Sequence, residues 1–275
     1  MPLEFKPVVS VITPVFNAER YLRRVVKSVQ QQSISFEHIL IDDGSTDVSR
    51  LILSNLELIY PTIKIIFLDK NSGPIIARNV GIAAATGRYL AFLDADDFWL
   101  PEKLEKQIAF MQKEECAISF TDYRFVSDDG GLIGELVHGP NKIGWRLHHM
   151  TRYLGCLTII IDREKIPDFI FPSINPSYRA EDFLAWAYVL TKTDAALRCP
   201  FDLARYSVVR NSRSSYIFRA IISVWRLYRK IEKISLFSSL LYFTLYIFFS
   251  LSKRIYCRPR FLTETIDKDC LWYYL

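Results

Sequence analysis

Short apolar runs alternate with longer amphipathic stretches over the first hundred residues of the chain. The longer stretches repeat apolar residues every three or four positions, which is the periodicity of a helix with one buried face. This alternation is typical of βαβ units that build a parallel sheet, so it predicts an α/β fold. The predicted strands are residues 8–12, 38–41, 63–68 and 88–93, and the predicted helices are residues 18–31, 48–59 and 73–85, with another helix after Pro101. Ser45 or Thr46 is expected to cap the second of these helices.

The pattern changes after residue 117. Residues 118–126 and 132–137 flank a turn with two glycines, and this arrangement predicts a hairpin. An apolar run at 157–161, a helix at 180–191 and a strand-like segment at 206–209 follow. We expect residues 1–215 to form one α/β domain and residues 216–275 to form a helical extension.

The extension is apolar and basic at once. Residues 236–251 carry no charge, but a stretch of this length is at the short limit for crossing about 30 Å of hydrocarbon. Just before it, aromatic and aliphatic residues interleave with Arg226, Arg229, Lys230 and Lys233, as in basic amphipathic helices that lie on anionic membranes. A helix pair lying in the membrane interface is favoured; a transmembrane span and a helix pair that closes the enzyme core are the alternatives.

Composition and charge narrow the class of protein. Half of the residues are apolar and 24% are charged, which excludes disordered and collagen-like chains. The net charge is +5, but residues 219–260 alone hold nine basic residues and one acidic residue, so the basicity belongs to one segment. This distribution favours an anionic membrane surface over nucleic acid as a partner. Five scattered cysteines without a C-x-x-C pair fit a reducing cytoplasm.

Polar residues follow three of the predicted strands, at the edge of a parallel sheet where ligands bind. These segments are Thr13-Pro14-Val15-Phe16-Asn17, Asp42-Asp43-Gly44 and Asp94-Ala95-Asp96-Asp97. No glycine-rich phosphate loop is present, so a bound diphosphate would need a cation to neutralise it. Asp94 and Asp96 project to one face of an extended backbone and offer paired oxygens to Mg²⁺ or Mn²⁺. The second Asp-x-Asp, at residues 267–269, is interpreted as a solvated acidic patch.

Asp42 and Asp43 leave two interpretations open. Asp43-Gly44 is an ordinary turn sequence, which needs no functional reason. Alternatively, a carboxylate beside the end of the first strand accepts a hydrogen bond from the N–H of a nucleobase, and uracil fits that role. We favour the second interpretation, with Asp43 ahead of Asp42.

The segments Ser10–Asn17, 41–47, Asn71-Ser72-Gly73, Ala77-Arg78-Asn79 and 94–97 occur in the order of the family 2 glycosyltransferases, which the chain resembles over about its first 110 residues. The resemblance implies a GT-A fold, a Rossmann-like mixed sheet flanked by helices, together with a nucleotide-sugar donor, a divalent metal and inversion at the anomeric carbon. It also implies roles for single residues. Pro14, Phe16 and Asp43 would surround the base, Arg78 would approach the base or the diphosphate, Asp94 the ribose and Asp96 the metal. For Arg78, a surface ion pair is the alternative.

Inversion by a single displacement needs a base that takes the proton of the acceptor hydroxyl from the side opposite the leaving group. Glu181-Asp182 matches the acidic pair of the family, with Asp182 as the base and Glu181 as a hydrogen-bonding partner of the acceptor or as a residue that orients that turn. Acidic residues also favour helix N-termini through the dipole alone. Arg210 and Arg213 belong to a basic loop that closes over the diphosphate, or else to a plain polar connector. The four histidines lack metal-ligand spacing and are interpreted as solvated or core residues.

Over most of its length the chain more loosely resembles bacterial O-antigen and capsule glycosyltransferases, especially those that add a β-1,3-linked hexose to N-acetylhexosamine-diphospho-undecaprenol. The segments that carry this likeness include residues 120–123, 155–158, 179–186 and 211–215. It implies a UDP-sugar donor and a polyprenyl-linked acceptor, with the enzyme at the cytoplasmic face of the inner membrane. The rival interpretations are a polyprenyl-phosphate sugar transferase of the same fold and a non-catalytic nucleotide-sugar-binding protein at the membrane.

Overall fold

The computed structural model describes residues 7–127, 131–133, 135–151, 153–173, 181–208 and 217–256. Its first half contains the strands and helices predicted from the apolar pattern, with ends shifted by a few residues. In chain order the predicted elements are β1 (Val9–Val15), α1 (Leu22–Gln30), β2 (Phe36–Asp42), α2 (Ser49–Ile59), β3 (Ile63–Phe67), α3 (Pro74–Ala84), β4 (Tyr89–Phe92) and α4 (Lys103–Lys113). The short strand β5 (Phe98–Trp99), between β4 and α4, was not predicted.

The second half completes a mixed sheet. Its elements are β6 (Ile118–Val126), β7 (Lys142–Ile143), α5 (Trp145–Met150), η1 (Cys156–Thr158), β8 (Ile159–Asp162), α6 (Glu181–Lys192), β9 (Ala196–Ser207), α7 (Ile217–Arg226), the π-helical η3 (Leu227–Ile231) and α8 (Leu236–Tyr256). The strand order is β3-β2-β1-β4-β8-β6-β9-β5, and β7 pairs with β9. Strands β1 to β4 are parallel as predicted, whereas β8 runs antiparallel to β4.

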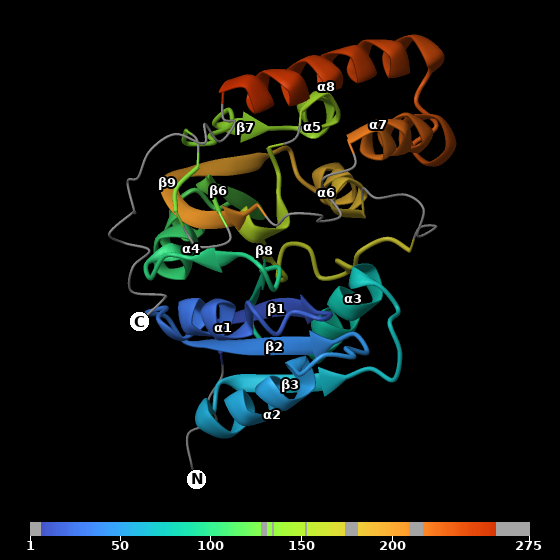
Figure 1. Cartoon of the computed structure of the whole chain (residues 1–275). Coiled ribbons are helices and arrows are strands. Elements are labelled where there is room, and N and C mark those ends of the chain that lie inside the picture. Colours follow the sequence, from blue (N-terminus) through green and yellow to red (C-terminus); the bar gives the residue numbers. More distant parts are fainter. Residues whose placement is uncertain are drawn as a thin grey trace.

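Helices cover both faces of this sheet, as Figure 1 shows. Helices α1, α2 and α4 contribute Val25, Leu53 and Ile108 to the core on one face. Helices α3 and α6 contribute Ala77 and Trp186 to the core on the other face. This is the mixed sheet with flanking helices that the sequence predicts, and it brings the carboxyl ends of β1, β2 and β4 to one edge.

Three local predictions need correction. Helix α2 has Val48 as its N-cap; the N–H of Ser49 bonds to Asp47 Oδ1 (2.9 Å), and Ser45 Oγ instead accepts the N–H of Asn17 (3.0 Å). The second arm of the predicted hairpin pairs antiparallel with β6 only through isolated bridges at residues 132 and 137, and residues 128–130 of the turn lie outside the described residues. The strand-like segment at 206–209 is the end of the longer strand β9, whose last residue is Ser207.

The last two helices pack against the domain. Tyr228 and Tyr246 are buried in one cluster with Phe183 and Leu184 of α6. Figure 1 shows α8 across the end of the molecule opposite α2, over α5. Among the described residues, no helix is both long and apolar enough to span a membrane. The division of the chain at residue 215 stays a prediction.

The turn after β2 requires glycine. Gly44 has φ +70°, and a Cβ there would lie 2.6 Å from the carbonyl carbon of Lys70. Because both backbone strain and a backbone clash result, we expect Gly44→Ala to lower the free energy of unfolding by about 2–4 kcal/mol, measured by urea denaturation. Gly73→Ala is the matched control: Gly73 has φ +91°, but a Cβ there would meet nothing within 4 Å. A Gly44→Ala loss no larger than that of the control would contradict the clash.

Candidate active site

The loops after β1 and β2 are bonded to each other. Asn17 has φ +49°, and its side-chain Oδ1 accepts the N–H of Thr46 (2.8 Å). Beside it, Phe16 is 46% exposed, and Pro14 lies in β1 opposite Ile41 of β2. Of the residues expected around a base, Phe16 is therefore the one that offers an open aromatic surface.

Asp43 connects this edge to helix α3. Its N–H donates to Val15 O (2.7 Å), and its two carboxylate oxygens accept the N–H groups of Ser72 (2.7 Å) and Gly73 (2.8 Å) at the start of the helix. Each oxygen keeps a second lone pair that could accept a nucleobase N–H. Asp42 is instead paired with Arg50 (2.7 Å), so of the two carboxylates Asp43 is the better placed toward α3.

Arg78 and Asp94 form an ion pair between α3 and the end of β4. Arg78 is 5% exposed, and its Nη2 contacts Asp94 Oδ1 (2.5 Å). Burial works to lower the pKa of the guanidinium, but the Cys156 thiol and the Asp94 and Glu181 carboxylates hold that pKa above its ordinary value. The predicted pairing of Arg78 with a carboxylate is present, but the arginine is buried and does not lie on the helix surface.

The acidic cluster after β4 consists of Asp94, Asp96 and Asp97. Asp97 is 2% exposed and accepts the N–H of Ser207 (2.8 Å). Burial raises its pKa well above the ordinary value, and the charges of Asp96 and Asp94 raise it further. Asp94 and Asp96, by contrast, are only half-buried.

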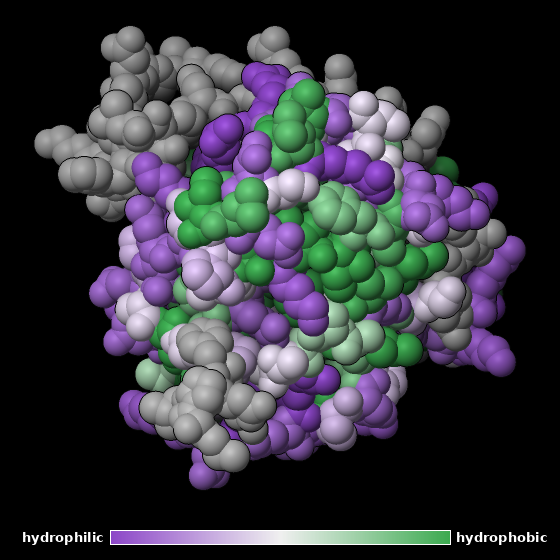
Figure 2. All heavy atoms as spheres, turned by 90° about the horizontal axis from the view of Figure 1, so that it is seen from below, coloured by the Kyte–Doolittle hydropathy of each residue, from purple (hydrophilic) through white to green (hydrophobic). Residues whose placement is uncertain are grey.

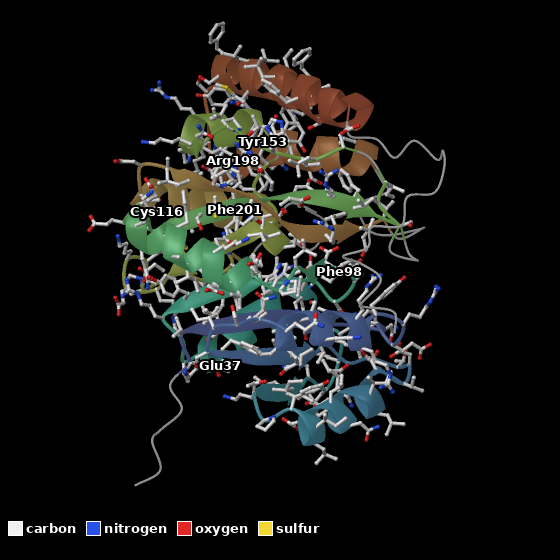
Figure 3. All side chains as sticks on the ribbon, turned by 90° about the vertical axis from the view of Figure 1, so that its left-hand side faces the viewer. Glu37, Phe98, Cys116, Tyr153, Arg198 and Phe201 are labelled. Atoms are coloured by element: carbon white, nitrogen blue, oxygen red, sulfur yellow. The ribbon has the colours of Figure 1, made fainter. Side chains whose placement is uncertain are left out.

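Arg24 is a site residue that the sequence did not reveal. Its Nη2 donates to the main-chain oxygen of Asp96 (2.8 Å) and to Ser207 Oγ (3.0 Å). The residue lies on the side of α1 away from Leu22 and Val25, where a solvated arginine is expected. It is buried because β5 covers that side, and its guanidinium lies over the Phe98 ring at 5.0 Å, near the position labelled in Figure 3.

The start of α6 faces the same region. Trp186 is fully buried against Phe92 of β4 and Phe171, with ring centroids 6.0 and 5.6 Å apart. Asp182 is four residues earlier, so it lies on the same face of the helix, one turn nearer its start. Its Oδ1 accepts the N–H of Phe183 (2.8 Å).

Cys156 lies where the two halves of the site meet. Because β8 is antiparallel to β4, the residues just before β8 lie at the same edge as the residues just after β4. Burial raises the pKa of the Cys156 thiol well above its ordinary value; Arg78 opposes this rise, and the Asp94, Asp182 and Glu181 carboxylates add to it. The structure thus brings the donor-side pair and the α6 carboxylates around one buried thiol.

Some predicted site residues are not placed. Arg210 and Arg213 lie outside the described residues, as does the acidic patch at 267–269. The strand leading toward the two arginines ends at Ser207, which bonds to Asp97. Three of the four histidines, His38, His148 and His149, are buried, which agrees with their interpretation as core residues.

The acidic cluster has the chemistry of a divalent cation site that a substrate completes. Within the described part of the chain, no group of three side chains is arranged to hold a metal alone. Two half-buried carboxylates, Asp94 and Asp96, stand beside a third that is buried, and Arg78 pairs with Asp94. Asp96 therefore fits as a single carboxylate ligand, with diphosphate oxygens as the remaining ligands.

An open sheet that carries acidic residues after β4, facing a helix that begins with two carboxylates, is the architecture of a GT-A glycosyltransferase. The chain has this fold in common with the TarS fragment 1–349 of S. aureus solved with UDP-GlcNAc (TM-score 0.63, 21% identity, 91% of this chain and 73% of that one). It also shares the fold with the mannosyltransferase PcManGT of Pyrobaculum calidifontis solved with GDP-Man and Mn²⁺ (TM-score 0.65, 15% identity, 89% and 70%).

The sequence comparisons identify the family. The model of glycosyl transferase family 2 matches residues 10–169, and the chain belongs to this family. It is 38% identical to the putative teichuronic acid biosynthesis glycosyltransferase TuaG of Bacillus subtilis over 91% of this chain and 99% of the relative. It is 32% identical to the UDP-Glc:alpha-D-GlcNAc-diphosphoundecaprenol beta-1,3-glucosyltransferase WfgD of Escherichia coli, over 79% and 83%. Both resemblances inferred from the sequence are confirmed.

Proposed function

We propose that the protein is an inverting hexosyltransferase that moves a hexose from a UDP-sugar to the sugar of a polyprenyl-diphosphate-linked acceptor, in the assembly of a cell-surface polysaccharide. The observation that carries the proposal is the Arg78–Asp94 ion pair after β4, at the edge where the residues before β8 also lie, with the α6 carboxylates acting electrostatically on the buried Cys156 thiol there. The names of two relatives, WfgD and WfaP, support the donor and acceptor classes, because both describe transfer from UDP-Glc to GlcNAc-diphosphoundecaprenol.

Donor binding is assigned to the strand ends. Phe16 stacks against uracil, and Asp43, held by the N–H groups of Ser72 and Gly73, accepts the uracil N–H. Asp94 bonds to the ribose hydroxyls while Arg78 keeps its carboxylate oriented. Arg210 and Arg213 approach the diphosphate from the segment that follows β9.

Asp96 would hold Mn²⁺ or Mg²⁺ together with the diphosphate of the donor. The Mn²⁺ solved in complex with the mannosyltransferase supports a divalent ion in this fold. When bound, the ion supplies positive charge against which the departing UDP accumulates negative charge. The chain contributes the position of Asp96, whose main-chain oxygen is fixed by Arg24.

Asp182 acts as the general base. It takes the proton from the acceptor hydroxyl while that oxygen attacks the anomeric carbon on the face opposite UDP. Glu181 hydrogen-bonds the acceptor sugar. Asp97 is buried, and the hydrogen bond that it accepts from the N–H of Ser207 fixes the end of β9 beside the site.

The enzyme works at the cytoplasmic face of the bacterial inner membrane, as a peripheral or monotopic protein. A polyprenyl-linked acceptor is confined to a bilayer, and the segment rich in basic and apolar residues after residue 218 suits an anionic leaflet.

The function is tested with the purified full chain, a synthetic GlcNAc-diphospho-lipid, and UDP-Glc, UDP-Gal and UDP-GlcNAc as donors. We expect one UDP-hexose to be used and the product to carry a β linkage, because a single displacement inverts the α-linked donor. Product stereochemistry is read by NMR. An α-linked product, or transfer only to polyprenyl phosphate, would overturn the proposal.

A further inference from the structure

Helix α8 is apolar on two opposite faces. Its inward face contributes Tyr246, which is 1% exposed, and packs Tyr242, Phe243 and Ile247 into the cluster shared with α6 and η3. Helices that are apolar all round are ordinarily covered on every side. In the described structure, α5, α6 and α7 cover only one side of α8.

The opposite side, here called the outer α8 face, is exposed. Its large side chains recur at the spacing of one helix stripe, so they form a continuous apolar strip about 16 Å long. The strip consists of Phe237 (80% exposed), Leu240 (52%), Leu241 (48%) and Phe248 (61%), with Thr244 among them. Figure 3 shows side chains of α8 projecting from the end of the molecule, away from the sheet.

The segment that carries the outer α8 face is strongly positive. Residues 217–256 contain seven basic residues and Glu232 as their only acidic residue. Arg226, Lys230 and Lys233 are exposed just before α8. A second copy of the chain would bring the same positive charge, so charge complementarity favours an anionic occupant.

A second apolar surface lies at the other end of the molecule, over α2 and β3, and Figure 2 looks onto it. There Leu51 is 64% exposed and Leu58 is 87% exposed. The segment 49–67 holds two basic residues and one acidic residue, so it lacks the charge of the tail. We call it the comparison surface, because it is apolar and exposed like the outer α8 face but lacks the positive charge.

We propose that the outer α8 face inserts in-plane into an anionic phospholipid bilayer, with the basic residues before α8 against the lipid headgroups. The proposal rests on the proposed function, since a bilayer-bound acceptor gives the enzyme a reason to dock. It adds which face docks: Phe237, Leu240, Leu241 and Phe248 enter the acyl boundary, and the helix does not span.

This docking places the start of α6, with the carboxylates assigned to the acceptor, next to the membrane. Phe183, directly after Asp182, lies 6.0 Å from the Tyr228 ring and 4.4 Å from the His148 ring between ring centroids. The start of α6 is thus one helix layer beneath the lipid-bound helix. Asp182 can meet a sugar that is held to the bilayer by its diphosphate, while the UDP-binding loops lie on the far side of Cys156.

The test uses the triple variant Phe237→Gln, Leu240→Gln and Phe248→Gln in the full chain. Glutamine preserves helix propensity, and circular dichroism checks the fold. Binding to vesicles of phosphatidylglycerol and phosphatidylethanolamine is measured by sedimentation. We expect the affinity to fall at least about tenfold for each side chain that no longer enters the bilayer.

Two controls separate the contributions of the outer α8 face and of the basic residues to vesicle binding. Leu58→Gln, on the comparison surface, should leave vesicle binding unchanged. Arg226→Gln with Lys230→Gln should weaken binding to anionic vesicles about fivefold per charge and leave the weak binding to phosphatidylcholine vesicles unchanged. Wild-type binding by the triple variant would overturn the proposal. So would a wild-type dimer that the triple variant converts to a monomer, because a second copy would then be the occupant.

Transfer assays distinguish this proposal from the proposed function. With a short-chain, water-soluble acceptor, the triple variant should keep wild-type turnover, and with a long-chain acceptor in vesicles it should lose at least tenfold. If the wild type fails to transfer to either acceptor, the proposed function is wrong, while the vesicle-binding result still decides whether the outer α8 face docks.

Discussion

Replacing Asp182 by asparagine is expected to lower the rate of transfer to a sugar acceptor by about 10²–10⁴-fold, the usual contribution of a positioned general base. The amide has the shape of the carboxyl group and can still accept the N–H of Phe183 through its oxygen, so the start of α6 should keep its structure. It cannot take the proton of the hydroxyl. The measurement is kcat with a soluble acceptor, alongside calorimetric UDP-sugar binding, which we expect to be unchanged.

Asp168→Asn is the matched control for this variant. Asp168 is an exposed carboxylate that accepts a hydrogen bond from Tyr188, near the other end of α6, so its loss should leave turnover intact. Undiminished activity of Asp182→Asn would point instead to a polyprenyl-phosphate acceptor, whose phosphate needs no deprotonation. If neither the variant nor the wild type turns over, although UDP-sugar binds, the non-catalytic interpretation is the correct one.

Replacing Asp96 by asparagine is expected to lower kcat by about 10³-fold or more, because the cation that neutralises the departing diphosphate loses its protein ligand. EDTA should abolish wild-type activity, and added Mn²⁺ or Mg²⁺ should restore it. In the variant, a large excess of Mn²⁺ should recover only part of the activity. Steady-state rates across a Mn²⁺ titration give the apparent metal affinity of each protein.

The Asp97→Asn variant tests whether the loss expected for Asp96→Asn is specific to the metal ligand or follows from changing any carboxylate of the acidic cluster. Asp97 is buried and its carboxyl group accepts the N–H of Ser207, and the amide oxygen of asparagine can accept the same N–H. We expect less than a tenfold loss and an unchanged metal titration. Wild-type activity that persists in EDTA, or equal losses in the Asp96 and Asp97 variants, would contradict the metal assignment.

The parallel half of the fold was predictable because its strands are short apolar runs and its helices have one buried face. Only the end of strand β9 was predicted, as the segment at 206–209, because Pro200 interrupts the alternation earlier in the strand. The structure accommodates Pro200 at a bulge, where the register with β6 jumps from Cys199 to Asp202. The alternation of apolar and polar residues therefore does not predict a long strand that contains a proline.

Site residues were predictable where they lie together in one short segment of the sequence, as at residues 94–97. Arg24 was not, since its burial depends on β5, which was not predicted and pairs with residues 204 and 205 of β9, before the predicted segment. The proximity of Asp94 to Asp182 likewise depends on β8 lying antiparallel beside β4. Apolar periodicity does not specify which distant strand inserts there, so the family resemblance alone connected the two residues beforehand.

The burial of Phe183 and Leu184 against Tyr228 and Tyr246 limits how this enzyme can be engineered. A fragment ending before α7, made for easier expression, would leave these side chains in water beside the reacting groups and would be prone to aggregation. A hybrid that borrows acceptor preference from a relative should therefore exchange α6 and the two terminal helices as one module.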